Sequence, residues 1–150
     1  MQRAEWYSGA RLTRVPDPGE VWRVVADAHA YWASQGVSPF DPEEAFARLG
    51  WETRCRSLVT ADCNHNAMLI PLLNGGFVVL VDEALAQRAH PTRDAVRHAL
   101  THELAHTFFY AATAPPKRLL PLEPYEELFC DAFAFEMLRQ PCRGLNEARV

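Results

Sequence analysis

Apolar residues recur at helical spacing in the first third of the chain. Between residues 20 and 35 they share one face of a helix, whose members are Val21, Val24, Val25, Ala28, Tyr31 and Trp32. Trp22 and Trp32 are interpreted as packing residues of the core rather than as ligand-binding aromatics. A second, shorter helix is predicted between Asp41, a favourable N-cap, and Gly50, a favourable stop.

Strand patterns follow these helices. Residues 51–57 alternate large and charged side chains, which predicts a strand. Residues 66–73 and 77–82 flank the turn Asn74-Gly75-Gly76, an arrangement typical of a β-hairpin. The second strand of this hairpin is apolar on both faces, so we expect it in the centre of the sheet.

Helical patterns return in the last third of the chain. One helix is predicted from residue 91 or 92 to residue 110, and another over 124–138. The segment 113–124 between them carries four prolines and no periodicity, which predicts a loop. Residues 1–17 predict a loose arm or an edge element. We therefore expect one α+β domain over residues 1–150, with helices packed on a small, mainly antiparallel sheet.

The first of these late helices carries the motif His102-Glu103-Leu104-Ala105-His106. Histidines at i and i+4 lie on one face of a helix, about one turn apart, so both rings can reach the same zinc ion. Glu103 can then take a proton from a water that the ion has made acidic. The uncharged flanks indicate a helix buried beside a cleft, and not an ordinary surface helix with two histidines.

A catalytic zinc ion needs a third protein ligand and one open position. Glu127 and Asp131 lie one turn apart on a stripe that continues through Ala134 and Leu138, so we expect both carboxylates to be buried and partnered. Glu127 is the predicted third ligand, and Asp131 the predicted acceptor for the ring N–H of a ligating histidine. The competing candidates for the third ligand are Glu126 and Glu123.

These segments resemble a known family. Residues 97–110 look like the active-site helix of ImmA/IrrE-type metallo-endopeptidases, which have a zincin-like fold. Residues 127–141 are similar to that family's second signature, through Glu127, Cys130, Asp131, Phe133, Ala134 and Pro141. A weaker resemblance extends through residues 41–51 and 77–82. The resemblance to this family implies regulated cleavage of a specific intracellular protein, such as a repressor encoded nearby.

The chain also departs from the family pattern. Ala105 stands where the family usually has Gly, Arg139 replaces an apolar residue, and Gln140 is an extra residue before Pro141. Many relatives carry a fused DNA-binding domain, but no helix-turn-helix pattern or basic arm is found in this sequence.

Composition narrows the function classes. The chain has 150 residues, of which 49% are hydrophobic and 23% charged, values typical of one globular domain. A net charge of -4 with interspersed signs argues against a nucleic-acid-binding surface. The first residues contain no apolar signal-type region, and no stretch has the length of a membrane span, so we expect a cytoplasmic protein.

The sequence contains four cysteines, which are Cys55, Cys63, Cys130 and Cys142. We interpret them as free thiols, and the alternative is a second metal site formed by Cys55, Cys63 and His65.

Several other residues have chemistry that the site can use. His98 lies one turn before His102 and can contact the substrate, with a half-exposed helix histidine as the alternative. Tyr110 or Tyr125 can stabilise a tetrahedral intermediate, with a buried structural role as the alternative for each. Arg118 can bind a substrate carboxylate, although a solvated role is favoured.

The sequence therefore predicts an enzyme with one zinc ion held by His102, His106 and Glu127. Glu103 is its general base, and its substrate is a peptide or protein. One alternative is a zinc hydrolase acting on a small peptide-like metabolite. The other is a catalytically silent zincin-fold binding or adaptor protein.

Overall fold

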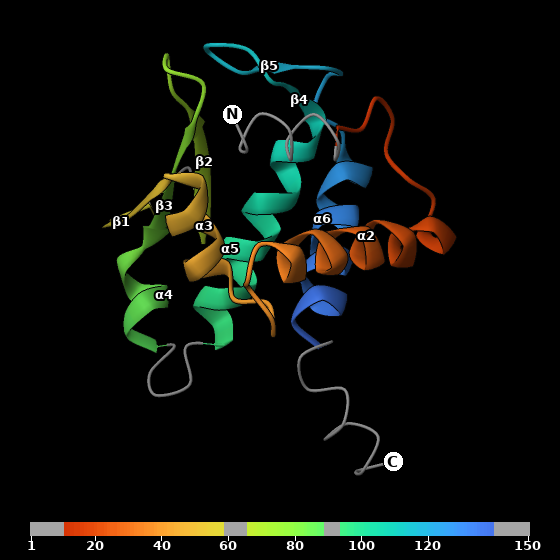
Figure 1. Cartoon of the computed structure of the whole chain (residues 1–150). Coiled ribbons are helices and arrows are strands. Elements are labelled where there is room, and N and C mark those ends of the chain that lie inside the picture. Colours follow the sequence, from red (N-terminus) through yellow and green to blue (C-terminus); the bar gives the residue numbers. More distant parts are fainter. Residues whose placement is uncertain (1–10, 59–65, 89–93, 140–150) are drawn as a thin grey trace, which may run out of the picture.

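A small sheet and two long helices form the centre of the protein (Figure 1). The computed structural model describes residues 11–58, 66–88 and 94–139. The main sheet has the order β1-β3-β2, and its strands are β1 (Glu52–Arg56), β2 (Ala67–Pro71) and β3 (Phe77–Asp82). The predicted hairpin is confirmed, since β2 and β3 pair antiparallel, and the second hairpin strand is central as expected.

The helices pack in layers on one side of this sheet. They are α2 (Val21–Ser34), α3 (Pro42–Leu49), α4 (Glu83–Arg88), α5 (Asp94–His106) and α6 (Pro124–Arg139), with short 3-10 turns at Pro18–Glu20 and Thr107–Phe109. Helix α5 lies between the sheet and α6, and α2 crosses α6 (Figure 1). The fold is α+β, with a small, mostly antiparallel sheet packed against helices, as the sequence predicts.

The core joins the sheet to both long helices. Its largest fully buried side chains include Phe77 on β3, Leu100 and Leu104 on α5, and Phe133 on α6. Phe133 packs edge-to-face against Phe108, with ring centroids 5.2 Å apart. Because α5 is buried on the sheet side and on the α6 side, the positions of its histidines are set by packing on both faces.

The short helix α3 follows the sequence signals closely. The Asp41 side chain accepts a hydrogen bond from the Glu43 backbone N–H at 3.1 Å, which caps the helix start. Gly50 ends the helix with a φ of 74°, a conformation that glycine adopts without steric cost.

Several sequence-based expectations are wrong. Trp22 is exposed, because α2 turns the side opposite Val25 and Ala28 to solvent, whereas Trp32 is buried as predicted. Helix α5 ends at His106 and does not extend to Tyr110, because the chain tightens into a 3-10 turn and then forms a strand.

The connecting segments also differ from the prediction. Strand β1 pairs with β3 in parallel, and helix α4 follows β3 directly. In the proline-rich segment, β5 (Lys117–Arg118) pairs antiparallel with β4 (Tyr110–Ala111), so part of the predicted loop is a hairpin. Of the predicted N-terminal arm, residues 1–10 lie outside the described residues. Residues 11–17 form no helix or strand, although the Leu12 backbone N–H donates to the Phe108 carbonyl at 2.6 Å.

Candidate metal centre

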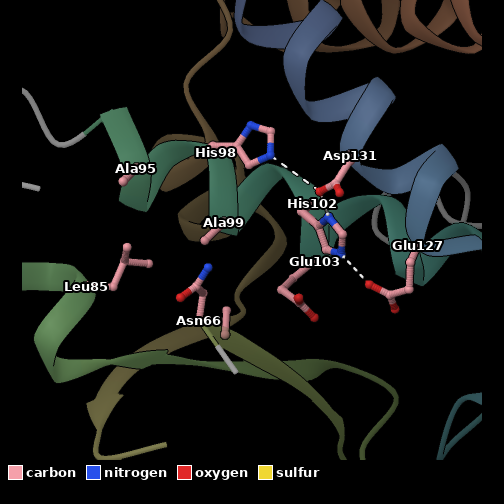
Figure 2. Close-up of a pocket in the computed structure, with 10 residues that line it drawn as sticks. Asn66, Leu85, Ala95, His98, Ala99, His102, Glu103, Glu127 and Asp131 are labelled. Atoms are coloured by element: carbon pink, nitrogen blue, oxygen red, sulfur yellow. Dashed lines mark hydrogen bonds and ion pairs between the residues drawn. The ribbon is translucent and has the colours of Figure 1, made fainter. Parts of the chain in front are cut away.

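Helices α5 and α6 bring the sequence-predicted ligands together. His102 and His106 lie one turn apart on α5, and Glu127 reaches them from α6. Figure 2 shows the approach of Glu127 to His102. The Nε2 atoms of the two histidines are 3.1 Å apart. The Glu127 carboxylate lies 3.1 Å from His102 Nε2 through Oε1 and 3.0 Å from His106 Nε2 through Oε2. The three groups therefore converge on one point.

The hydrogen-bond partners of the two rings explain why a cation fits this cluster. His102 Nδ1 lies 2.7 Å from Asp131 Oδ1, and His106 Nδ1 lies 2.6 Å from Glu126 Oε2. An ionised carboxylate can only accept, so each Nδ1 must carry the proton and donate it. In the neutral rings both Nε2 atoms then present lone pairs toward each other and toward Glu127. Such a set of facing acceptors is stabilised by a positive ion between them.

The distances suit zinc. With zinc–nitrogen and zinc–oxygen bonds near 2.0–2.1 Å, tetrahedral geometry places neighbouring ligand atoms about 3.3 Å apart. The two Nε2 atoms are 3.1 Å apart, and each lies 3.0 to 3.1 Å from a different oxygen of Glu127, so each distance is within a few tenths of an ångström of this value. Two neutral histidines and one carboxylate also form a donor set that zinc accepts in hydrolytic sites, where a fourth position stays open.

The charges around the histidines affect their pKa values in opposite ways. Burial lowers the pKa of His102, and the neighbouring His106 lowers it further. Burial also lowers the pKa of His106, but the hydrogen bond to Glu126 and the charges of Glu103 and Glu127 outweigh it, so the net shift is upward. Without a bound cation, the carboxylates around His106 therefore favour its protonated form, whereas the surroundings of His102 favour the neutral ring.

Glu103 lies beside this cluster but is not one of the three candidate ligands. It projects from α5 into the space between α5 and the sheet (Figure 2), and only 8% of its surface is exposed. Burial, together with the negative charge of Glu127, raises the pKa of Glu103 to about 7 despite the opposing effect of His106. A carboxylate with a pKa near neutrality can both accept and return a proton at physiological pH.

The predicted burial of Glu127 and Asp131 is wrong. Their side chains are 52% and 61% exposed, because the part of α6 that carries them lines the open cleft above α5, whereas Ala134 on the same stripe is buried. Asp131 nevertheless contacts His102, where the sequence analysis places it. His98 also lies near Asp131, with its Nε2 3.5 Å from Asp131 Oδ1 (Figure 2).

The buried carboxylate of α6 is Glu126, which sequence reasoning treats as a competing ligand. It is fully buried and contacts the Nδ1 atom of His106, whereas Glu127 contacts the Nε2 atom. Glu123, the other competitor, is exposed and lines neither hollow of the cleft.

Arg118 compensates the charge of Glu126 and is not solvated as predicted. Its Nη1 donates to Glu126 Oε2 at 2.8 Å, its Nη2 donates to Oε1, and its Nε donates to the Leu120 carbonyl at 3.0 Å. Sequence offered one signal for this role, the charged pair Lys117-Arg118 within a proline-rich segment. That signal does not specify the partner.

The cleft continues on both sides of Glu103. One hollow, of about 490 Å³, is lined on its far side by Asn66, Leu85, Ala95, His98 and Ala99. The other, of about 290 Å³, is lined on its far side by Met68, Leu69, Tyr110, Arg118 and Leu122. Both hollows share Ala67, Glu103 and Glu127. Tyr110 is half-buried against the second hollow, whereas Tyr125 is exposed and lines neither.

The cysteines add one alternative donor. The Cys130 sulfur lies within 4.8 Å of ring nitrogens of His102 and His106, and burial raises its pKa well above the usual range. Because zinc binds the thiolate, this buried thiol is a weaker ligand than the ionised Glu127 carboxylate, whose oxygens already lie at ligand–ligand distance. Cys55 is exposed, while Cys63, His65 and Cys142 lie outside the described residues.

Comparisons of this chain with protein-family models, with curated proteins and with solved structures give no match. Among residues 11–58, 66–88 and 94–139, no helix has both the length and the apolar character needed to cross a membrane.

Proposed function

We propose that this protein is a zinc-dependent metallo-endopeptidase that cleaves a peptide bond in a specific protein substrate. One observation carries the proposal: His102 Nε2, His106 Nε2 and the Glu127 carboxylate converge on one point, and the buried carboxylate of Glu103 lies beside that point. His102, His106 and Glu127 would hold the ion. An adaptor protein that only kept the zinc fold would have no need for Glu103.

The residues of the chain divide the chemistry between them. A bound zinc ion would polarise the scissile carbonyl and make a water acidic. Glu103 would accept a proton from the attacking water and return it to the leaving amine. Asp131 and Glu126 would keep the histidine rings in the tautomer that presents Nε2. Tyr110 lines the second hollow and would donate to a developing oxyanion.

The shape of the cleft favours an endopeptidase over an enzyme for a small metabolite. Hollows extend on both sides of Glu103, so a polypeptide can continue past the cleaved bond in both directions. Strand β2 is an edge of the main sheet and supplies Ala67, Met68 and Leu69 to these hollows. An extended substrate can therefore add to this edge as a further strand. A small peptide-like metabolite would need one closed pocket and not a continuous cleft.

Membership of the ImmA/IrrE-type endopeptidases is part of the same proposal. The support is that the two segments resembling that family, residues 97–110 and 127–138, lie side by side as α5 and α6. On this reading the substrate is one partner protein, such as a repressor encoded nearby, cut at an extended segment.

The test combines metal analysis with substrate cleavage. Purified protein is analysed for metal, and wild type and Glu103→Gln are incubated with repressor proteins encoded beside the gene. Site-specific cleavage by wild type and its loss in Glu103→Gln are expected. Glu123→Gln is the matched control, since this exposed carboxylate is outside the cleft. Cleavage by Glu103→Gln at the wild-type rate would refute the proposed chemistry.

A further inference from the structure

We infer that Glu126 and Arg118 form a positioning pair for His106, linking the β4–β5 hairpin on the rim of the cleft to the metal centre. The inference rests on the proposed function, because it assigns a role to residues around the same metal site. It names two residues whose spacing and identity do not belong to the HExxH motif. Both act through His106 and contact neither the ion nor the reacting bond.

Burial makes Glu126 the most constrained carboxylate in the described part of the chain. It has no exposed surface, and an ionised carboxylate in such a place is costly unless every lone pair is used. Oε1 accepts from Arg118 Nη2, and Oε2 accepts from both Arg118 Nη1 and His106 Nδ1. The two N–H donors of the Arg118 guanidinium bring a positive charge to this buried carboxylate. Glu126 therefore remains an acceptor for the His106 ring.

The shared oxygen Oε2 separates a positioning role from a simple ion pair. If the pair served only to attach α6 to the hairpin, the fork of Arg118 would satisfy the carboxylate without a third partner. Instead, Oε2 lies 2.8 Å from Arg118 Nη1 and 2.6 Å from His106 Nδ1. The Arg118 guanidinium thus holds Glu126 Oε2 in place, and this oxygen orients the His106 ring. The orientation of the ring directs its Nε2 atom toward Glu127.

Arg118 also faces the substrate hollow. It lies opposite Tyr110 in the β4–β5 register, and its guanidinium carbon is 5.2 Å from the centroid of the Tyr110 ring. Both residues line the second hollow. A substrate that presses on this wall therefore contacts the residue that orients His106. By linkage, any change in zinc affinity caused by a substrate in this hollow is matched by an equal change in substrate affinity caused by zinc.

The other histidine has a weaker support, which provides an internal comparison. His102 Nδ1 is held by Asp131, whose side chain is largely exposed and whose further contact is His98 at 3.5 Å. Water can replace Asp131 at that nitrogen, whereas it cannot reach the buried Nδ1 of His106. We therefore expect the loss of Glu126 to weaken zinc binding more than the loss of Asp131.

The experiment measures zinc affinity of the full chain by titration against a competing chelator. Glu126→Gln should bind zinc at least 10-fold more weakly than wild type, within the 10–100-fold range typical of such partners. Arg118→Lys keeps the positive charge but loses the two-pronged hydrogen bonding of the guanidinium. Its zinc affinity should lie between those of wild type and Glu126→Gln. Glu136→Gln is the matched control on the same helix, since it breaks only an exposed ion pair with Arg139 at 2.9 Å and should bind as wild type.

A second readout separates orientation from stability. The visible absorption of the cobalt-substituted protein reports ligand geometry, and it should change in Glu126→Gln and Arg118→Lys but not in Glu136→Gln. If Glu126→Gln does not fold, the same measurements on Arg118→Lys decide the question. Wild-type affinity and an unchanged cobalt spectrum in Arg118→Lys would overturn the inference while leaving the zinc site intact. Absence of zinc binding by wild type would instead overturn the proposed function itself.

Discussion

His102 and His106 face each other through Nε2 atoms 3.1 Å apart, and a carboxylate holds the opposite nitrogen of each ring. Two lone pairs at this distance repel unless something positive lies between them. The arrangement is therefore a strong reason to expect a metal, and it yields the first prediction.

The purified protein should bind about one equivalent of zinc, because three protein ligands converge on one point. His102→Ala, His106→Ala and Glu127→Ala should each lose most of the metal, whereas Glu123→Ala should keep it. Elemental analysis of the dialysed proteins measures this. Full occupancy in Glu127→Ala would remove Glu127 from the ligand set and leave Cys130, within 4.8 Å of both rings, as the next candidate.

Glu103→Gln should retain zinc and the fold but lose turnover by about 10²- to 10⁴-fold, the usual contribution of a general base. The amide cannot accept a proton, although it occupies the same volume. Single-turnover cleavage of the protein substrate, with zinc content measured on the same sample, checks this. A variant that lost its zinc would instead show that Glu103 contributes to metal binding.

Zinc binding should release protons from Glu103. At pH 6.5 a carboxyl group with a pKa of about 7 is roughly three-quarters protonated, and the positive charge of zinc lowers that pKa and expels the proton. Calorimetric titrations in two buffers of different ionisation enthalpy count the protons released. Glu103→Gln should release fewer at pH 6.5, and the difference should vanish at pH 8.5, where Glu103 is already ionised. Equal proton release at pH 6.5 would contradict the raised pKa.

Asp131→Asn should weaken zinc binding less than Glu126→Gln does, because the Asp131 side chain is exposed and its amide replacement can still accept from His102 Nδ1. We expect a loss of about 10-fold or less, at the lower end of the range for such partners. The chelator titration described above measures both variants side by side. A larger loss for Asp131→Asn would mean that the open carboxylate, and not the buried one, supports the site.

The second hollow should select the substrate. Leu122 lies on its wall with 64% of its surface exposed, so Leu122→Ser should fold normally while lowering kcat/KM for the natural substrate by several-fold. Leu73→Ser is the control, since Leu73 is 83% exposed and outside both hollows. Zinc content should be unchanged in both. Identical kinetics for the two variants would place substrate selection elsewhere, for example along the β2 edge.

Local signals predict much of this fold because each depends on a few neighbouring residues. The caps of α3, the Asn74-Gly75-Gly76 turn and the periodicity of α2 are of this kind, and the structure contains all three elements. The parallel pairing of β1 with β3 depends on residues 26 positions apart, and no local pattern encodes it. The same holds for the end of α5, where packing of Phe108 and Phe109 replaces a helical turn with a tighter one.

The site divides in the same way. The spacing of His102, Glu103 and His106 is a property of one helix, and sequence identifies it directly. Which of two consecutive glutamates is buried depends on how α6 is rotated against α5, and that rotation is set by contacts with Phe129, Phe133 and Met137. For this reason the sequence analysis identifies Asp131 as a histidine partner but misses the partnership of Glu126 with Arg118.

Glu126 and Glu127 contact the two nitrogens of one imidazole from consecutive positions of α6. Consecutive residues on an α-helix diverge by about 100°, so the two carboxylates approach His106 from opposite sides only at one angular setting of the helix. The rotation of α6 about its own axis is therefore fixed by its two contacts with the His106 ring. Insertions or deletions between β5 and Pro124 change only the length of the segment that leads into α6. Inserting or deleting one residue between Glu126 and the buried face of Phe129 and Phe133 would instead remove both carboxylates from His106 at once.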